Sequence, residues 1–117
     1  MNAQLTEALA HRTILAFEGA AVSNGVPVSA IIGAKGAKQL TIRCKTQVNG
    51  TLIVRFLRPD KVTEYATNQP SDTVIAAAPS EQRIQVTDCE GVTHIKVQFT
   101  PSANGTFNFL DVAYLYQ

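Results

Sequence analysis

One short segment of the sequence concentrates side chains that can ligate a metal or attack a substrate. Residues 88–94, "DCEGVTH", contain four of them: Asp88, Cys89, Glu90 and His94. A zinc site needs about four ligands at suitable spacing, and the only other histidine of the chain is His11. The favoured interpretation is therefore structural, with a strand end, a turn at Gly91 and a histidine on the polar face of the next strand. We expect no metal and no cofactor.

Three further acids stand where carboxylate chemistry is conceivable. Asp60 and Glu64 lie in the loop segment "RPDKVTEY" (58–65), and glycosidases use paired carboxylates. Nothing in the sequence sets the distance between them, so solvation and pairing with neighbouring cations is the favoured interpretation. Asp111 is a lone acid in an apolar segment, where it can mark a β-bulge, accept from a loop amide or ligate calcium. Calcium needs six or more oxygens, so we favour a structural role.

The two cysteines do not form a disulfide framework. Cys44 alternates with polar residues on the apolar side of "LTIRCKT" (40–46), which predicts a small buried residue rather than a nucleophile. Without an export signal, Cys44 and Cys89 default to free thiols, with a disulfide between them as the alternative. No Gly-x-Ser-x-Gly elbow is present, and "GAKGAK" (33–38) lacks phosphate-loop spacing. We therefore expect that the protein is not an enzyme.

The word "NGT" occurs twice in the chain, at 49–51 and 104–106. Both copies match the N-glycosylation acceptor pattern. They also lie between alternating segments, where Asn-Gly favours a tight hairpin turn with positive φ. We favour the turn over the glycan, and we expect positive φ at Gly50 and Gly105.

Alternation of apolar and polar residues predicts about eight short strands. The segments are 12–17, 26–32, 40–46, 51–58, 73–78, 83–88, 93–100 and 106–116. Strands at this spacing without a second helix indicate an all-β antiparallel sandwich, jelly-roll-like in topology. The phase of the apolar residues changes near Leu110 and Asp111, which predicts a β-bulge or a change of sheet.

Length and charge narrow the class of protein. The 117 residues suit one domain and carry a net charge of +1. We expect an N-terminal arm or helical turn over 1–12 and one sandwich domain over 13–117. The balanced charge argues against nucleic acid and against an anionic membrane. No apolar run approaches a membrane span, and residues 1–12 do not form a signal peptide. We therefore expect a protein that is made and kept in a cytoplasm, or one exported without such a signal.

Two resemblances suggest functions. The segment "KQLTIRCKTQVNGTLIVRFL" followed by "GTFNFLDVAYLY" resembles galactose-binding-like jelly rolls, which occur as carbohydrate-binding modules; this implies carbohydrate as a partner, with the module on a phage tail or a cell surface. In size and style, a small, near-neutral jelly roll with an N-terminal arm is similar to cement or decoration proteins of tailed-phage capsids. That resemblance implies a non-enzymatic protein on the capsid surface of a virion, made in the host cytoplasm.

We favour the second resemblance, which implies protein partners: the major capsid protein and a second copy, as a homodimer or homotrimer. From the residues, we expect the contacts in the arm 1–12 and the loops 33–38 and 59–72. The arm offers apolar side chains, the loop 33–38 offers cations, and the loop 59–72 mixes polar groups with one aromatic anchor. The predicted interface residues are Leu5, Leu9, Lys35, Lys38, Asp60, Lys61, Glu64, Tyr65 and Asn68.

Overall fold

The computed structural model describes residues 11–77, 81–87 and 89–115, with the backbone alone for residues 11–17. It contains eight strands and, in these residues, no helix. The strands are β1 (His11–Val22), β2 (Val28–Gly33), β3 (Gln39–Thr46), β4 (Gly50–Leu57), β5 (Thr73–Ile75), β6 (Gln82–Val86), β7 (His94–Pro101) and β8 (Gly105–Leu115). All eight predicted strands are confirmed, although β5 and β6 are shorter than expected. No helix in the described residues is long and apolar enough to cross a membrane.

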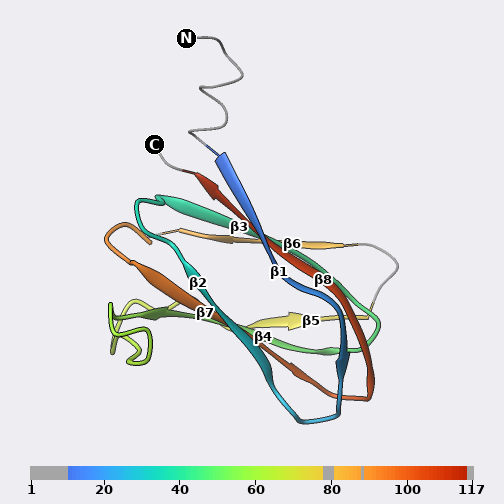
Figure 1. Cartoon of the computed structure of the whole chain (residues 1–117). Helices are drawn as coiled ribbons and strands as arrows, with labels where there is room; N and C mark the ends of the chain where they lie inside the picture. The colour runs from blue at the N-terminus through green and yellow to red at the C-terminus, as the bar shows by residue number, and fades with distance from the viewer. Residues whose placement is uncertain (1–10, 78–80, 88, 116–117) are drawn as a thin grey trace, which may run out of the picture.

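The strands form two facing antiparallel sheets, as the sequence predicted (Figure 1). The first sheet has the order β1-β8-β3-β6 and the second the order β2-β7-β4-β5. Among the described strands only β4 and β5 are consecutive neighbours within one sheet, so every other connection crosses between the sheets. Strands that are distant in sequence are therefore paired, as β1 is with β8.

The core lies between the sheets and follows from the alternation of each strand. In β3, Leu40, Ile42 and Cys44 are fully buried while the residues between them face outward. Phe99 of β7 meets Phe107 of β8 edge to face, with ring centroids 4.7 Å apart. This contact joins the two sheets, because aromatic pairs at such a distance and angle attract beyond their burial.

The two Asn-Gly-Thr words do not form hairpins. β3 and β4 belong to different sheets, and so do β7 and β8, so both words lie at corners where the chain changes sheet. Gly50 and Gly105 are not among the positive-φ glycines, and that prediction is wrong. At position 50 glycine is required because there is no room for a side chain. A Cβ on Gly50 would lie 2.5 Å from the Phe99 ring and from the Thr100 carbonyl oxygen.

The asparagines of the same words hold neighbouring loops. The Asn49 side-chain oxygen accepts from the Ala77 amide at 2.6 Å, and that of Asn104 accepts from the Asn24 amide at 2.8 Å. These contacts favour the structural interpretation of both words, because carboxamide oxygens satisfy loop amides that no strand pairs.

The predicted irregularity in the last strand is confirmed. The register of β8 with β3 shifts between Lys45 and Thr46, which leaves Asn108 as the extra residue. The register of β8 with β1 also shifts, opposite Leu110 and Asp111. As a result, Phe107 and Leu110 both face the core, and Asp111 faces outward.

Candidate functional site

Three loops lie at the same end of the sandwich, which we call the loop end: 34–38, 58–72 and 89–93. The Ala34 amide donates to the Thr93 carbonyl at 2.8 Å, and the Lys38 amide donates to the Leu115 carbonyl at 2.8 Å. Figure 1 shows these loops at the same end of the two sheets, with the loop before β3 beside the end of β8. The loops 33–38 and 59–72, which we predicted to contact partners, thus lie at one end of the molecule.

Asp60 shapes the first part of the 58–72 loop. One of its carboxylate oxygens accepts from the Val62 and Thr63 amides, each at 2.8 Å, and the other accepts from the Thr63 hydroxyl at 2.5 Å. These hydrogen bonds, led by that of the Thr63 hydroxyl, lower the pKa of Asp60 to about 2. They stabilise a tight turn in which Lys61 has a φ of 66°. Asp60 is therefore committed to its own turn rather than available for acid–base chemistry.

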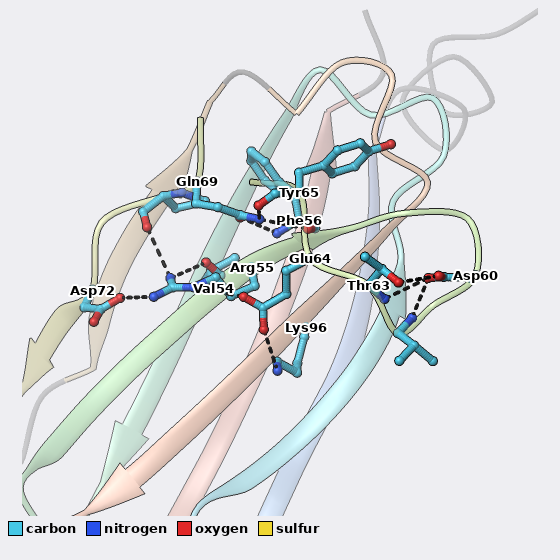
Figure 2. Close-up of polar contacts among 12 residues, drawn as sticks. Val54, Arg55, Phe56, Asp60, Thr63, Glu64, Tyr65, Gln69, Asp72 and Lys96 are labelled. Carbon is cyan, nitrogen blue, oxygen red and sulfur yellow. Dashed lines mark hydrogen bonds and ion pairs between the residues drawn. The ribbon is translucent and has the colours of Figure 1, made fainter. Parts of the chain in front are cut away.

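The Gln69 side chain makes hydrogen bonds to the β4 backbone that a neighbouring strand would otherwise make. Its amide nitrogen donates to the carbonyl oxygens of Phe56 and Tyr65, each at 2.9 Å, and its oxygen accepts from the Phe56 amide at 2.6 Å (Figure 2). One carboxamide can do this because it carries both donors and an acceptor. The side chain ties the end of the loop to β4 ahead of β5, which begins at Thr73.

Tyr65 is the aromatic residue that these contacts position. Its amide donates to the Phe56 carbonyl at 3.1 Å, and its own carbonyl accepts from Gln69. One part of the ring packs against the core, and the Arg58 guanidinium lies 5.4 Å from the ring centroid. Figure 2 shows the hydroxyl at the tip of the ring pointing away from Gln69. Hydrogen bonds therefore hold the backbone at Tyr65, while the core and Arg58 contact its ring.

A hollow of about 310 Å³ adjoins this ring, and we call it the loop-end hollow. It is lined by Tyr65, Thr67, Asn68, Glu90, Gly91 and Val92. Asn68 has a φ of 59° and Gly91 one of 82°, so both sit in tight loop conformations. The lining combines an aromatic ring with a hydroxyl, a carboxamide and a carboxylate. That combination suits a small polar ligand with apolar patches, which can contact the ring while its polar groups are hydrogen-bonded.

The other predicted interface residues are distributed differently. Lys35 and Lys38 are exposed on the loop between β2 and β3, at the same end but outside the lining of the hollow. Glu64 turns to the outer face of the second sheet, where it pairs with Lys96 at 3.1 Å and Arg55 at 3.6 Å. Leu5 and Leu9 lie outside the described residues. A protein-contact role for these residues stays a prediction.

Arg55 links that ion-pair group to the loop. Its guanidinium pairs with Asp72 at 2.8 Å and donates to the Pro70 carbonyl at 3.3 Å (Figure 2). The acids are about half exposed, so each pair contributes little stability on its own. Glu64 is directed to Arg55 and Lys96, whereas Asp60 is directed to Thr63 (Figure 2), so the two carboxylates are engaged with different partners rather than with a shared site between them.

The two cysteines and His94, which the sequence also offered as chemical candidates, make contacts typical of structural residues. Cys44 is a free, buried thiol, and burial, followed by the charge of Glu81, raises its pKa to about 11. The Cys89 thiol is buried 3.6 Å from the Ala37 carbonyl oxygen. His94 contacts the Thr93 hydroxyl at 3.0 Å, and Asp88 lies outside the described residues. Within those residues no group of three potential metal ligands occurs.

A second hollow lies on the outer face of the first sheet, away from the loops. It measures about 350 Å³ and is lined by Thr41, Arg43, Arg83, Asp111 and Ala113. Asp111 stands out in the sequence as a lone acid, whereas the two arginines were not predicted as site residues. Arg43 and Arg83 are 40 positions apart and meet only because β3 pairs with β6. The outward positions in "LTIRCKT" and "RIQVTD" identify each arginine as exposed, but they do not indicate that the two are adjacent.

Comparison with known proteins gives likenesses of structure only. No protein-family model matches the chain, and no curated protein matches it. One similar solved structure is a glycoside hydrolase family 43 arabinoxylan arabinofuranohydrolase from Bacillus subtilis in complex with cellotetraose, with 19% identity and a TM-score of 0.48. That likeness covers 92% of this chain and 21% of the hydrolase, so the chain spans about a fifth of that protein.

Another similar structure is a family 6 carbohydrate-binding module, with 11% identity and a TM-score of 0.47. The likeness covers 90% of this chain and 82% of the module. At such identities and TM-scores, neither structure carries an argument about what this chain binds. The chain is similar to both in its β-sandwich arrangement.

Proposed function

We propose that this protein is a non-catalytic binding module and that the loop-end hollow binds a neutral carbohydrate. The observation that carries the proposal is the Tyr65 ring, which packs against the core and lies beside Thr67, Asn68 and Glu90, on a backbone that hydrogen bonds to Phe56 and Gln69 hold. A sugar ring has an apolar face of C–H groups and a rim of hydroxyls. The aromatic ring suits the first, and the amide, hydroxyl and carboxylate suit the second.

The protonation and pairing of the candidate catalytic groups support binding rather than catalysis. A general base works best with a pKa near the operating pH, but the pKa of Asp60 is about 2 because its own turn donates to it. A reactive cysteine needs an accessible, low-pKa thiol, and Cys44 is buried with a pKa of about 11. Glu64 is engaged in ion pairs.

The test is binding of immobilised neutral oligosaccharides, followed by calorimetry with the best ligand. Tyr65→Ala is expected to weaken binding at least about tenfold, as the loss of a central aromatic contact does at binding sites. Tyr65→Phe is expected to retain most of the affinity because the ring remains. The matched control is Phe109→Ala, which removes a partly exposed aromatic side chain from the outer face of the first sheet. Melting temperatures verify that each variant is folded.

Two results would contradict the proposal. One is the absence of any binding to neutral oligosaccharides by the wild-type chain. The other is an equal loss of affinity in Tyr65→Ala and Phe109→Ala, which would place the ligand elsewhere or show a general effect of aromatic loss.

A second candidate function is docking to a protein through the same end. It is supported by the gathering of the loops 34–38 and 58–72 at the loop end, with exposed Lys35, Lys38 and Lys61. A capsid protein as that partner, the virion as the location and a homodimer or homotrimer all stay predictions. Light scattering of the purified chain at increasing concentration tests self-association, and a strictly monomeric mass would contradict it.

A further inference from the structure

A row of charged side chains crosses the outer face of the first sheet. Arg43 of β3 is directly opposite Arg83 of β6 on one side and directly opposite Asp111 of β8 on the other. Directly opposite side chains on neighbouring strands have Cβ atoms about 5 Å apart. The sheet therefore holds two guanidinium groups and one carboxylate side by side, and these three residues line the hollow of about 350 Å³.

The charges of this row make no ion pair with the side chains that the structure describes. Among the described residues, the ion pairs join Arg55, Glu64, Asp72 and Lys96 on the other sheet. No ion pair within the described part of the chain involves Arg43, Arg83 or Asp111, although Asp111 is next to Arg43 in register. Two arginines directly opposite one another are destabilising. The pair therefore weakens the free protein slightly and leaves donors available to a ligand.

The hollow exists because small residues separate these charges from the next row. Thr41 of β3 is opposite Ala113 of β8, one outward position along from Arg43 and Asp111. The side chains of Thr41 and Ala113 are short, so the surface is low there while the longer side chains rise beside it. A ligand group can enter beside the guanidinium groups and be contacted from more than one side. Two exposed arginines on a flat surface offer no such enclosure.

We propose that this sheet-face hollow binds a carboxylate-bearing saccharide, such as a uronic acid. Guanidinium groups match carboxylates with two parallel hydrogen bonds, which makes the contact both strong and directional. Arg43 and Arg83 recognise the ligand carboxylate. Asp111, which as a carboxylate can only accept hydrogen bonds, accepts from sugar hydroxyls beside it. This site is separate from the loop-end hollow and does not depend on neutral sugar binding there.

Asp111 is the feature that selects this ligand class over simple or dense anions. A sulfate or phosphate ion has no hydroxyl-rich framework to satisfy Asp111, and a highly sulfated or phosphorylated polymer would place negative charge against it. Like charges at such short range are unfavourable. A ligand with one carboxylate next to neutral hydroxyls satisfies all three charged residues at once.

The experiment is calorimetry and amide NMR with trigalacturonate and with its fully methyl-esterified form, which keeps the sugar framework but lacks the charge. We expect trigalacturonate to bind, with amide shifts at Thr41, Arg43 and Ala113, and the ester to bind at least about tenfold more weakly. Arg43→Gln and Arg83→Gln are each expected to weaken binding about tenfold or more, as for the loss of a charged hydrogen bond. Asp111→Asn is expected to weaken it by about fivefold.

The matched control is Lys35→Gln, which removes one exposed positive charge outside the hollow and is expected to change affinity less than about twofold. Tyr65→Ala is expected to leave trigalacturonate binding intact, so failure of the loop-end proposal is distinguishable from failure here. Absence of trigalacturonate binding, or equal binding of the ester, overturns the proposal. Sulfate that binds as tightly as trigalacturonate, with Asp111→Asn strengthening both, also overturns it in favour of a simple anion site.

Discussion

At the scale of single residues, short polar side chains at both ends of the sandwich satisfy backbone amides. Asp60, Asn49 and Asn104 each attract attention in the sequence as chemical groups, the first as an acid and the others as glycosylation acceptors. Each accepts from the amide of a loop residue, Asp60 twice and the asparagines once. Their oxygens replace the strand partner that a loop amide lacks. Their role follows from which amide is near, and that proximity is set by the fold.

The pH dependence of the Asp60 turn follows from these hydrogen bonds. Its pKa falls from 3.8 to about 2 in the folded protein, so its contribution to stability is complete above about pH 4 and is lost as the pH falls towards 2. We expect an NMR titration of the Asp60 carboxyl carbon to have a midpoint near pH 2. Thr63→Val, which removes the hydroxyl donor, is expected to move the midpoint up towards 3.8.

Thr67→Val is the control for that titration, because Thr67 makes no hydrogen bond to Asp60 within the described residues. It is expected to leave the midpoint unchanged. A wild-type midpoint near 3.8, or a midpoint that Thr63→Val does not move, would show that Asp60 does not hold this turn in solution.

At the scale of strands, local alternation is enough to locate all eight elements but does not determine which strands pair. In β3 and β7 the polar and apolar residues alternate without interruption, and such a pattern depends on neighbours alone. Asn-Gly between two alternating segments predicts a reversal of the chain, and a reversal occurs at both words. The error was to pair the flanking strands, because the second strand enters the opposite sheet.

In the candidate sites, too, features set by local sequence were predicted and features set by long-range contacts were not. Tyr65 was identified as an exposed aromatic in a loop because loop position and residue type are both local. Gln69 was missed because its three partners belong to β4 and to Tyr65, whose positions follow from the folded loop. Arg43 and Arg83 were missed as a pair because the register between β3 and β6 is a property of the whole sheet.

The corners between the sheets give a stability prediction at this scale. Gly50→Ala is expected to destabilise by about 2 kcal/mol, within the range for overpacking a filled site, because its Cβ would meet the Phe99 ring and the Thr100 carbonyl oxygen at 2.5 Å. Gly105→Ala is expected to cost less, because its Cβ would meet Cγ1 of Val48, the end of a side chain that can rotate. Urea unfolding measures both.

Gly33→Ala is the matched control, since a Cβ at that strand position meets nothing within 4 Å. It is expected to be neutral or slightly stabilising. Gly50→Asn separates crowding from backbone conformation. Asparagine tolerates positive φ better than alanine does, so a Gly50→Asn variant clearly more stable than Gly50→Ala would contradict the crowding explanation.

At the scale of the whole molecule, the sandwich presents its two candidate sites on different surfaces. The loop-end hollow lies where the loops 58–72 and 89–93 meet, whereas the sheet-face hollow lies on β3, β6 and β8. Arg43 is four residues along β3 from Gln39, which begins the strand at the loop end; at strand spacing this is about 13 Å. The two hollows therefore have no lining residue in common.

Separate linings on a packed scaffold predict independent binding. We expect saturation with trigalacturonate to change the affinity for a neutral oligosaccharide less than about twofold, and the reverse measurement to give the same factor, because coupling between two sites is reciprocal. The free-energy losses of Tyr65→Ala and Arg83→Gln are likewise expected to add within about 0.5 kcal/mol. Calorimetry with one ligand in the presence of the other measures the coupling. A larger coupling would show that the loop 58–72 and the outer face of the first sheet change conformation together.

An acidic glycan long enough to reach both hollows is expected to bind more tightly than either short ligand, because attachment at one hollow raises its effective concentration at the other.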